Sequence, residues 1–241
     1  MKSNFLKYDF EKSRGRIDEI LEAADTSYEE VDSIPSRDKL TFANGFYVNC
    51  TALFVDIRKS SELPGKYKRP TLAKIYRSYV SEIVAVMNGN INCSEINIQG
   101  DSVWGIFDTP LKSDIDYTFG TAAQISSVID TLNCKYKKKS IDPITVGIGM
   151  DYGRALMIKA GYIGSGINDV VWMGEVVNYA SKLCSYGNKE WGDKEVMVSN
   201  VIQNNLNEHN QKLLEKNYNR NCYHGYVVNT EMDEWIKQNC K

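Results

Sequence analysis

The stretch Ala52-Leu-Phe-Val-Asp-Ile57 is a short apolar run that carries one acid near its end. Together with the residues before it, it predicts a strand over 47–56, because apolar and β-branched runs of this length are typical of buried strands. Since side chains alternate along a strand, Ala52, Phe54 and Asp56 share one face. The stretch therefore predicts a carboxylate at the carboxyl end of a buried strand.

The segments that follow show helix and strand patterns in turn. Apolar residues at three- and four-residue spacing make a strong helix at 72–87, and a glycine-containing turn at 99–101 indicates a hairpin. The remaining expected elements are strands over 91–98 and 102–107, a helix over 114–139, strands over 143–150 and 154–159 around a turn at 151–153, and a helix over 173–186. The core order strand, helix, strand, strand, helix, strand predicts an α+β, ferredoxin-like (βαββαβ) fold with added strands and helices.

Two regions are expected along the chain. Residues 1–45 read as an N-terminal helix and arm, with an amphipathic helix over 9–24 and a polar, turn-rich linker over 26–45. Residues 46–241 form the main domain. The 241 residues suffice for a sizeable core.

The composition limits the class of protein. A net charge of −2 argues against a nucleic-acid binder, and no apolar run is long enough to span a membrane. The N-terminus lacks a signal-peptide core, so we expect a cytoplasmic protein. The six cysteines form no Cys-x-x-Cys pair, which disfavours a zinc site, and in the cytoplasm they are expected to be reduced.

Asp56 and Asp101 are the candidate metal ligands. In a ferredoxin-like plan the first and third core strands are neighbours, so the turns that carry these two acids can meet. Carboxylate oxygens suit Mg²⁺, which keeps part of its water shell. Taken singly, Asp101 is a common turn residue and Asp56 a possible helix cap. Ser60 and Ser61 begin a short helix whose backbone N–H groups could hold phosphates, or they serve only as caps.

These pieces resemble the catalytic domain of class III nucleotide cyclases. The chain carries Phe54-Val-Asp-Ile57, Gly100-Asp101, Gly147-Ile-Gly149 and Gly174-Glu-Val-Val-Asn-Tyr-Ala-Ser-Lys-Leu183 in the family's order. The resemblance implies that Asp56, Asp101 and the Ile57 carbonyl bind two divalent ions, Mn²⁺ or Mg²⁺. It further implies that Asn178 holds the ribose and that Lys182 faces the attacked phosphate. It also implies a homodimer with composite active sites, because this helix serves the opposing subunit.

The chain departs from the family at several of these positions. Lys182 stands where arginine is usual, and lysine offers a point charge in place of a planar fork. Asn97 and Val171 stand where adenylate cyclases carry a lysine and an aspartate that read the purine edge. Phe54 shares a face with Asp56, so it either packs on the base or belongs to the core. The loss of the paired charges argues against ATP.

The segment 36–61 and the short N-terminal helix resemble the pyrimidine cyclases of the bacterial Pycsar antiphage system. This resemblance implies conversion of UTP to cyclic UMP, or of CTP to cyclic CMP, with the product acting on a separate effector protein. Two alternatives stay open at this point. One is a purine cyclase with an unusual pocket, and the other is a regulator that binds nucleotide without turnover.

Overall fold

The computed structural model describes residues 2–240. Nine strands within these residues form one sheet in the order β3-β4-β2-β5-β7-β9-β8, with β1 beside β2 and β6 beside β5. The strands are β1 (Tyr28–Val31), β2 (Gly45–Ile57), β3 (Cys93–Gln99), β4 (Ser102–Asp108), β5 (Val146–Tyr162), β6 (Ile167–Met173), β7 (Val196–Val198), β8 (Glu215–Asn217) and β9 (Cys222–Gly225). The α-helices are α1 (Phe10–Leu21), α2 (Leu63–Lys66), α3 (Arg69–Asn88), α4 (Lys112–Lys137), α5 (Glu175–Tyr186), α6 (Asn200–Asn205), α7 (Glu208–Gln211) and α8 (Thr230–Asn239). Three 3₁₀ turns are η1 (Asp25–Ser27), η2 (Arg37–Lys39) and η3 (Ser60–Glu62).

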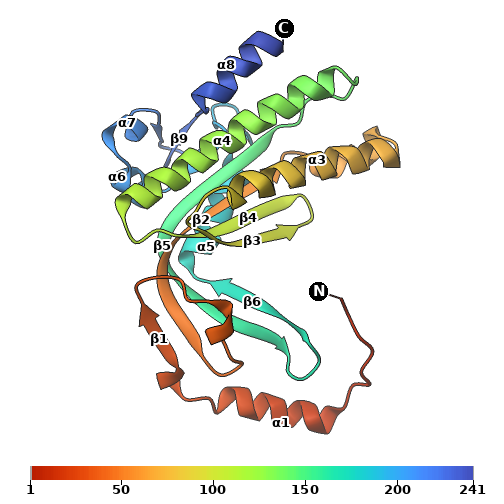
Figure 1. The fold of residues 1–241 in the computed structure, drawn as a ribbon, viewed down its shortest axis with the longest axis vertical. Helices are drawn as coiled ribbons and strands as arrows, with labels where there is room; N and C mark the ends of the chain where they lie inside the picture. The colour runs from red at the N-terminus through yellow and green to blue at the C-terminus, as the bar shows by residue number, and fades with distance from the viewer. Residues whose placement is uncertain (1, 241) are drawn as a thin grey trace.

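The ferredoxin-like plan is confirmed in β2, α3, β3, β4, α4 and β5. Strand β4 lies antiparallel beside β2, as expected for the first and third core strands. Helices α3 and α4 cover one face of the sheet, and α5 lies against the other (Figure 1). This arrangement leaves the carboxyl end of β2 and the β3–β4 turn at the same edge.

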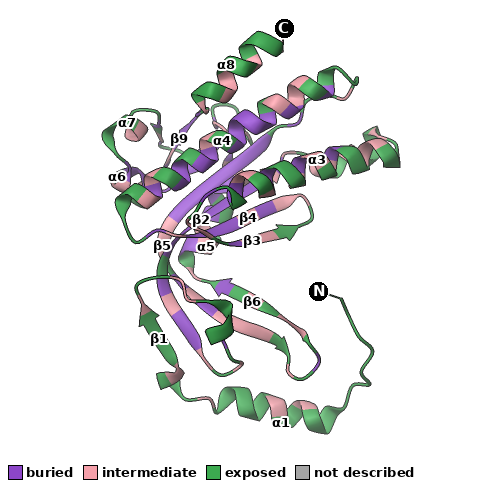
Figure 2. Ribbon diagram, viewed as in Figure 1, coloured by how far each residue is buried: buried purple, intermediate pink, exposed green. Residues whose placement is uncertain are grey.

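Each face of the sheet has its own apolar core. Leu53 and Val55 point into the larger core under α3 and α4. Ala52 and Phe54, which alternate with them, point into the second core under α5. Because side chains alternate along β2, one strand supplies both cores, and it is buried along most of its length (Figure 2).

An arm extends from the core, built from the first half of β2 and the second half of β5 with β1, β6 and α1 (Figure 1). The helix expected at 9–24 is present as α1 and contributes no buried residue. The expected linker is more ordered than predicted. It contains β1, which pairs in parallel with β2, and Leu40, which is 4% exposed.

The turn expected at 151–153 is wrong, because β5 is one continuous strand. Its pairing with β2 runs without a break from Val146 to Ile158. Asp151 is 7% exposed and sits in the middle of this ladder. Cross-strand pairing and burial outweigh the local preference of an Asp-x-Gly sequence for a turn.

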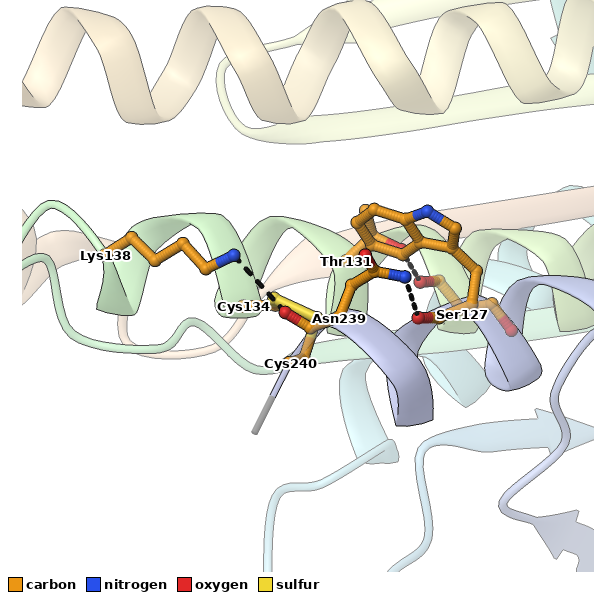
Figure 3. The surroundings of a disulfide bond; sticks show 7 residues. Ser127, Thr131, Cys134, Lys138, Asn239 and Cys240 are labelled. Carbon is orange, nitrogen blue, oxygen red and sulfur yellow. Dashed lines mark hydrogen bonds between the residues drawn. A yellow bond between two sulfur atoms is a disulfide. The ribbon is translucent and has the colours of Figure 1, made fainter.

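The expectation that all cysteines are reduced is wrong for Cys134 and Cys240, which form a disulfide. The bond joins α4 to the residue after α8, and α8 lies along α4 (Figure 3). The Lys138 ammonium donates to the Asn239 carbonyl beside it. The two cysteines are 106 positions apart, so their spacing gave no sign of the pairing. Within residues 2–240 we find no helix with both the length and the apolar character needed to cross a membrane.

Candidate active site

Asp56 and Asp101 come together at one edge of the sheet. Asp56 is the penultimate residue of β2, and Asp101 lies in the β3–β4 turn, where Gly100 takes the left-handed backbone (φ 67°) that the tight hairpin requires. Burial and then the neighbouring Asp101 carboxylate raise the pKa of Asp56. The Oδ2 atom of Asp101 is buried without a hydrogen-bond partner. Two crowded carboxylates with an unsatisfied oxygen fit a site for divalent cations.

Across residues 2–240, no group of three or more His, Cys, Asp or Glu side chains is placed to hold a metal ion. A site built from Asp56 and Asp101 therefore leaves most coordination positions to backbone oxygen, water or substrate. Ile57 ends β2 directly after Asp56, which puts its carbonyl at the same edge. Mg²⁺ is commonly bound in this way, by one or two carboxylates plus phosphate oxygens.

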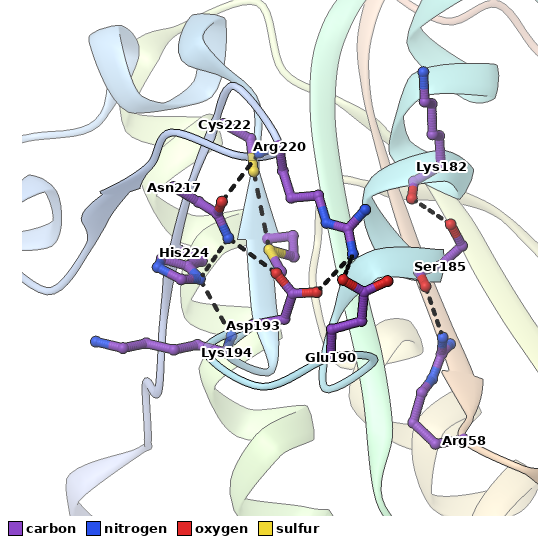
Figure 4. A network of polar contacts seen from close by, with 11 residues as sticks. Arg58, Lys182, Ser185, Glu190, Asp193, Lys194, Asn217, Arg220, Cys222 and His224 are labelled. Atoms are coloured by element: carbon purple, nitrogen blue, oxygen red, sulfur yellow. Dashed lines mark hydrogen bonds and ion pairs between the residues drawn. The ribbon is translucent and has the colours of Figure 1, made fainter.

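Arg58 ties this edge to helix α5. Its guanidinium donates to the Asp56 carboxylate at 3.1 Å. It also donates to the Ser185 carbonyl at 3.1 Å (Figure 4). The side chain is only 14% exposed. The sequence indicated no more than local positive charge here. The partner at Ser185 is 127 positions away, so only the fold reveals this link.

Asn97 and Phe54 lie on the face that α5 covers. The Nδ2 atom of Asn97 is buried without a partner, and Asn97 pairs across the hairpin with Trp104. Trp104 stacks on Phe54 with ring centroids 5.0 Å apart and planes 6° from parallel. Phe54 is 7% exposed and belongs to the core, so Trp104, which is half-buried, lies nearer the surface of this stack. No local motif in the sequence marks Trp104 as a site residue.

Helix α5 packs unusually close to β5. A Cβ atom at Gly149 would lie 2.1 Å from the Cys184 backbone nitrogen, so only glycine allows this approach. The helix buries Val176, Ala180, Leu183 and Cys184 against the sheet.

The opposite face of α5 carries the two candidate catalytic residues. Asn178 and Lys182 are exposed and project from the same side, one turn apart. In Figure 4 Lys182 extends away from the ion-pair cluster of Arg220 and Asp193. Within the described residues of one chain, neither side chain makes a hydrogen bond or ion pair with Asp56 or Asp101. The structure brings the two acids together and leaves Asn178 and Lys182 facing outward.

Ser60 and Ser61 begin η3 after Lys59, which has left-handed backbone (φ 55°). Neither serine caps the turn with its side chain, so the expectation of an ordinary serine cap is wrong. Both residues lie within five positions of Asp56 in the sequence. Their proximity to Asp56 leaves phosphate binding by the backbone as a prediction.

Val171 lies on β6 and is 38% exposed. Its neighbour Trp172 points to the opposite side of the strand and is buried in the core under α5. The indole N–H of Trp172 has no hydrogen-bond partner. The structure therefore places Val171 on the arm, apart from Asp56 and Asp101.

The comparisons define the class of this protein. The profile of the adenylate and guanylate cyclase catalytic domain matches residues 43–232, and the chain belongs to this family. A protein named uridylate cyclase from Gulbenkiania mobilis is 41% identical over 99% of the chain and 100% of its own length. A second uridylate cyclase, from Treponema porcinum, is 37% identical over 97% of the chain and 82% of its own length. The solved structure of a bacterial light-regulated adenylyl cyclase superposes with a TM-score of 0.65 at 17% identity, covering 82% of this chain and 59% of that one.

Proposed function

We propose that this chain is a pyrimidine nucleotide cyclase that converts UTP to 3′,5′-cyclic UMP and diphosphate. The observation that carries the proposal is the pair of crowded carboxylates, Asp56 and Asp101, in a chain whose full-length relatives are named uridylate cyclases. The base positions support it, because Asn97 and Val171 lack the paired charges that read a purine edge. CTP is the alternative substrate within the same class.

Asp56, Asp101 and the Ile57 carbonyl would hold two divalent cations, Mn²⁺ or Mg²⁺. The chemistry that such ions supply is activation of the ribose 3′-hydroxyl and neutralisation of charge on the departing diphosphate. Arg58 holds the Asp56 carboxylate at the strand end through its 3.1 Å contact. The backbone at Ser60 and Ser61 lies next in the chain and would cradle the phosphates.

Asn178 and Lys182 would complete the active site from the opposing subunit. Asn178 would orient the ribose, and Lys182 would bring a cation to the phosphate under attack. Both face outward on their own chain, which supports a homodimer whose two active sites each combine the acids of one subunit with α5 of the other. Asn97, with its unpartnered donor, would meet the base beside Trp104. Phe54 would support the base subsite from behind, through its stack on Trp104.

The product would act as a second messenger in antiphage defence, read by a separate effector protein. This part of the proposal follows from the resemblance to the Pycsar cyclases.

The test is to incubate the protein with each of the four nucleoside triphosphates separately, with Mn²⁺, and to identify the products. Cyclic UMP and diphosphate from UTP are expected. Cyclic CMP as the main product would move the assignment to CTP. Turnover of ATP or GTP in preference to both pyrimidines would overturn the proposal.

Asp56→Asn and Asp101→Asn should each reduce turnover by roughly 10³-fold or more, because each removes one charge from the cation site. Asp108→Asn is the matched control. Asp108 also has a raised pKa from burial and an unpartnered buried oxygen, but it lies at the opposite end of β4. Full activity in either of the first two variants would refute the two-metal assignment.

A further inference from the structure

The last turn of α5 is held by an arginine that comes from the edge carrying Asp56. The Nη1 group of Arg58 donates to the Ser185 carbonyl at 3.1 Å (Figure 4). Its Nη2 group donates to the Asp56 carboxylate, also at 3.1 Å. The carbonyls of a last helical turn have no partner within the helix, and the helix dipole favours a cation beside them. Arg58 therefore holds the end of α5 and Asp56 at the same time.

The guanidinium of Arg58 has little freedom to leave this position. Its side chain is 14% exposed, and its Nε is buried without a hydrogen-bond partner, so the two Nη groups make its polar contacts. The group lies against β5, where a Cβ atom at Gly147 would come within 3.0 Å of Nη2. Because a buried cation loses its hydration, its partners have to stay in place to offset that loss. The separation between Asp56 and the end of α5 is therefore fixed.

The turn that Arg58 holds is also the turn that carries Lys182. The Ser185 hydroxyl donates to the Lys182 carbonyl at 2.7 Å (Figure 4). Hydrogen bonds thus connect Asp56 through Arg58 and Ser185 to the backbone of Lys182. The Lys182 side chain is exposed and extends away from Arg58 (Figure 4). Arg58 therefore fixes the base of this side chain without touching its ammonium group.

We propose that Arg58 is a positioning residue for the active site of the opposing subunit, because it fixes the turn of α5 from which Lys182 reaches the attacked phosphate. This inference rests on the proposed function and deepens it. Arg58 follows Asp56 by two positions, yet through α5 it acts on the site to which its own subunit contributes no acid. A displacement of about 1 Å near a reacting group can lower a rate by roughly 100-fold, so a loosened end of α5 should slow turnover.

The experiment uses a mixed dimer with one complete site. One subunit carries Lys182→Ala and contributes the acids, and the other carries Asp101→Asn and contributes α5. Different affinity tags on the two subunits allow the mixed dimer to be purified. Arg58→Gln is then added to the Asp101→Asn subunit, whose own acids take no part in catalysis. At saturating UTP and Mn²⁺, kcat should fall by about tenfold, because the support of Lys182 is the part of the complete site that has changed.

Arg220→Gln in the same subunit is the matched control. Arg220 is also a largely buried arginine at the end of α5, where its guanidinium carbon lies 4.3 Å from the centre of the Tyr186 ring, but its ion pairs are with acids outside the helix. Its kcat should stay at the value of the parent mixed dimer. If Arg58→Gln lowers kcat only when it is placed in the Lys182→Ala subunit, Arg58 acts on Asp56 alone and the inference is overturned.

A second measurement does not depend on turnover. Hydrogen–deuterium exchange without metal reports how firmly the end of α5 is held. Exchange over residues 183–187 should be faster in Arg58→Gln than in the wild type, and equal exchange overturns the inference. If Arg58→Gln does not fold, Arg58→Lys decides, since one ammonium cannot span both Asp56 and Ser185. An unchanged kcat for Arg58→Lys in the subunit that contributes α5 overturns the inference as well.

The outcomes separate this inference from the proposed function. A wild type that does not cyclise UTP refutes the function, and the exchange measurement still decides whether Arg58 holds α5. An inactive parent mixed dimer beside an active wild type refutes the composite site, and with it the role of Arg58 across the dimer. An active parent mixed dimer whose kcat survives Arg58→Gln refutes only the role of Arg58.

Discussion

Lys182 stands where the resemblance to the class III cyclases would place an arginine. It is exposed on the outer side of α5, one turn after Asn178. If it carries the charge that supports the attacked phosphate, Lys182→Ala should lower kcat for UTP by on the order of 10³-fold. Lys182→Arg should keep most of the activity, because it restores a cation with better phosphate geometry. Initial rates of diphosphate release measure both.

Lys189→Ala is the control for this prediction, since Lys189 is also exposed and follows the same helix. Equal rates for Lys182→Ala and Lys189→Ala would show that Lys182 is an ordinary surface lysine. Tight nucleotide binding by the wild type with no diphosphate release would favour a non-catalytic regulator.

Among individual residues, the sequence predicted those side chains whose role depends on a local motif. Asp56 and Asp101 were identified because a strand end and a glycine turn are local patterns, and the structure places them together. Arg37 and Arg58 were not, because their partners are remote. Arg37 reaches Glu95 across 58 positions and Asp169 across 132. No single sequence encodes such a pairing visibly.

Among the secondary-structure elements, the long helices and the core strand order were predictable from apolar periodicity. Strand β6 was missed, and β5 was divided in two by a turn that does not exist. Both errors arise in the arm, where pairing with β2 and with β6 decides the backbone conformation. Local preference for a turn at Asp151-Tyr-Gly153 is worth less than an intact ladder of backbone hydrogen bonds.

The disulfide between Cys134 on α4 and Cys240 after α8 is expected to stabilise the fold. Cys134→Ser should lower the free energy of unfolding by about 2–4 kcal/mol under oxidising conditions, because it removes a cross-link that closes a long loop. Urea unfolding with and without reductant measures the loss.

Cys93→Ser is the control, because Cys93 is free and lies outside this contact. Reductant should destabilise the wild type and the Cys93 variant alike, and should leave Cys134→Ser unchanged. A wild type whose stability does not change with reductant would contradict a stabilising Cys134–Cys240 disulfide.

For the whole molecule, buried acids should make stability depend on pH. Burial raises the pKa of Glu195 from its ordinary 4.5 to about 7, although the Ser126 hydroxyl donates to it and opposes the shift. The folded state therefore holds this proton more tightly than the unfolded state. The stabilisation is complete below about pH 4.5 and is lost as the pH rises towards 7.

Glu195→Gln should remove this dependence and leave the variant more stable than the wild type at pH 8, by roughly 1–3 kcal/mol. Urea unfolding at pH 5 and pH 8 gives the difference. Glu208→Gln, at an exposed site, should keep the wild-type dependence of the unfolding free energy on pH. If the unfolding free energy of Glu195→Gln varies with pH as in the wild type, ionisation of Glu195 does not destabilise the folded state.

The composite active sites proposed above predict how mixed subunits should behave. Asp101→Asn and Lys182→Ala disable opposite halves of the site, so a dimer with one of each subunit keeps one intact site. Random mixing should restore about a quarter of wild-type activity. Each variant alone provides the baseline, and a mixture no more active than the baseline would place both residues in the same subunit's site.

The ordered segment before β2, from Tyr28 to Asn44, limits how far the protein can be truncated at its N-terminus. A fragment that begins at Phe46 would lose Leu40, which is buried in the core under α5, and β1, which pairs with the first residues of β2. It would also leave the Glu95 carboxylate buried with no counter-charge. Truncation designed around the boundary of the matched family profile would therefore yield an insoluble or misfolded product, and expression trials should retain the chain from at least Tyr28 onward.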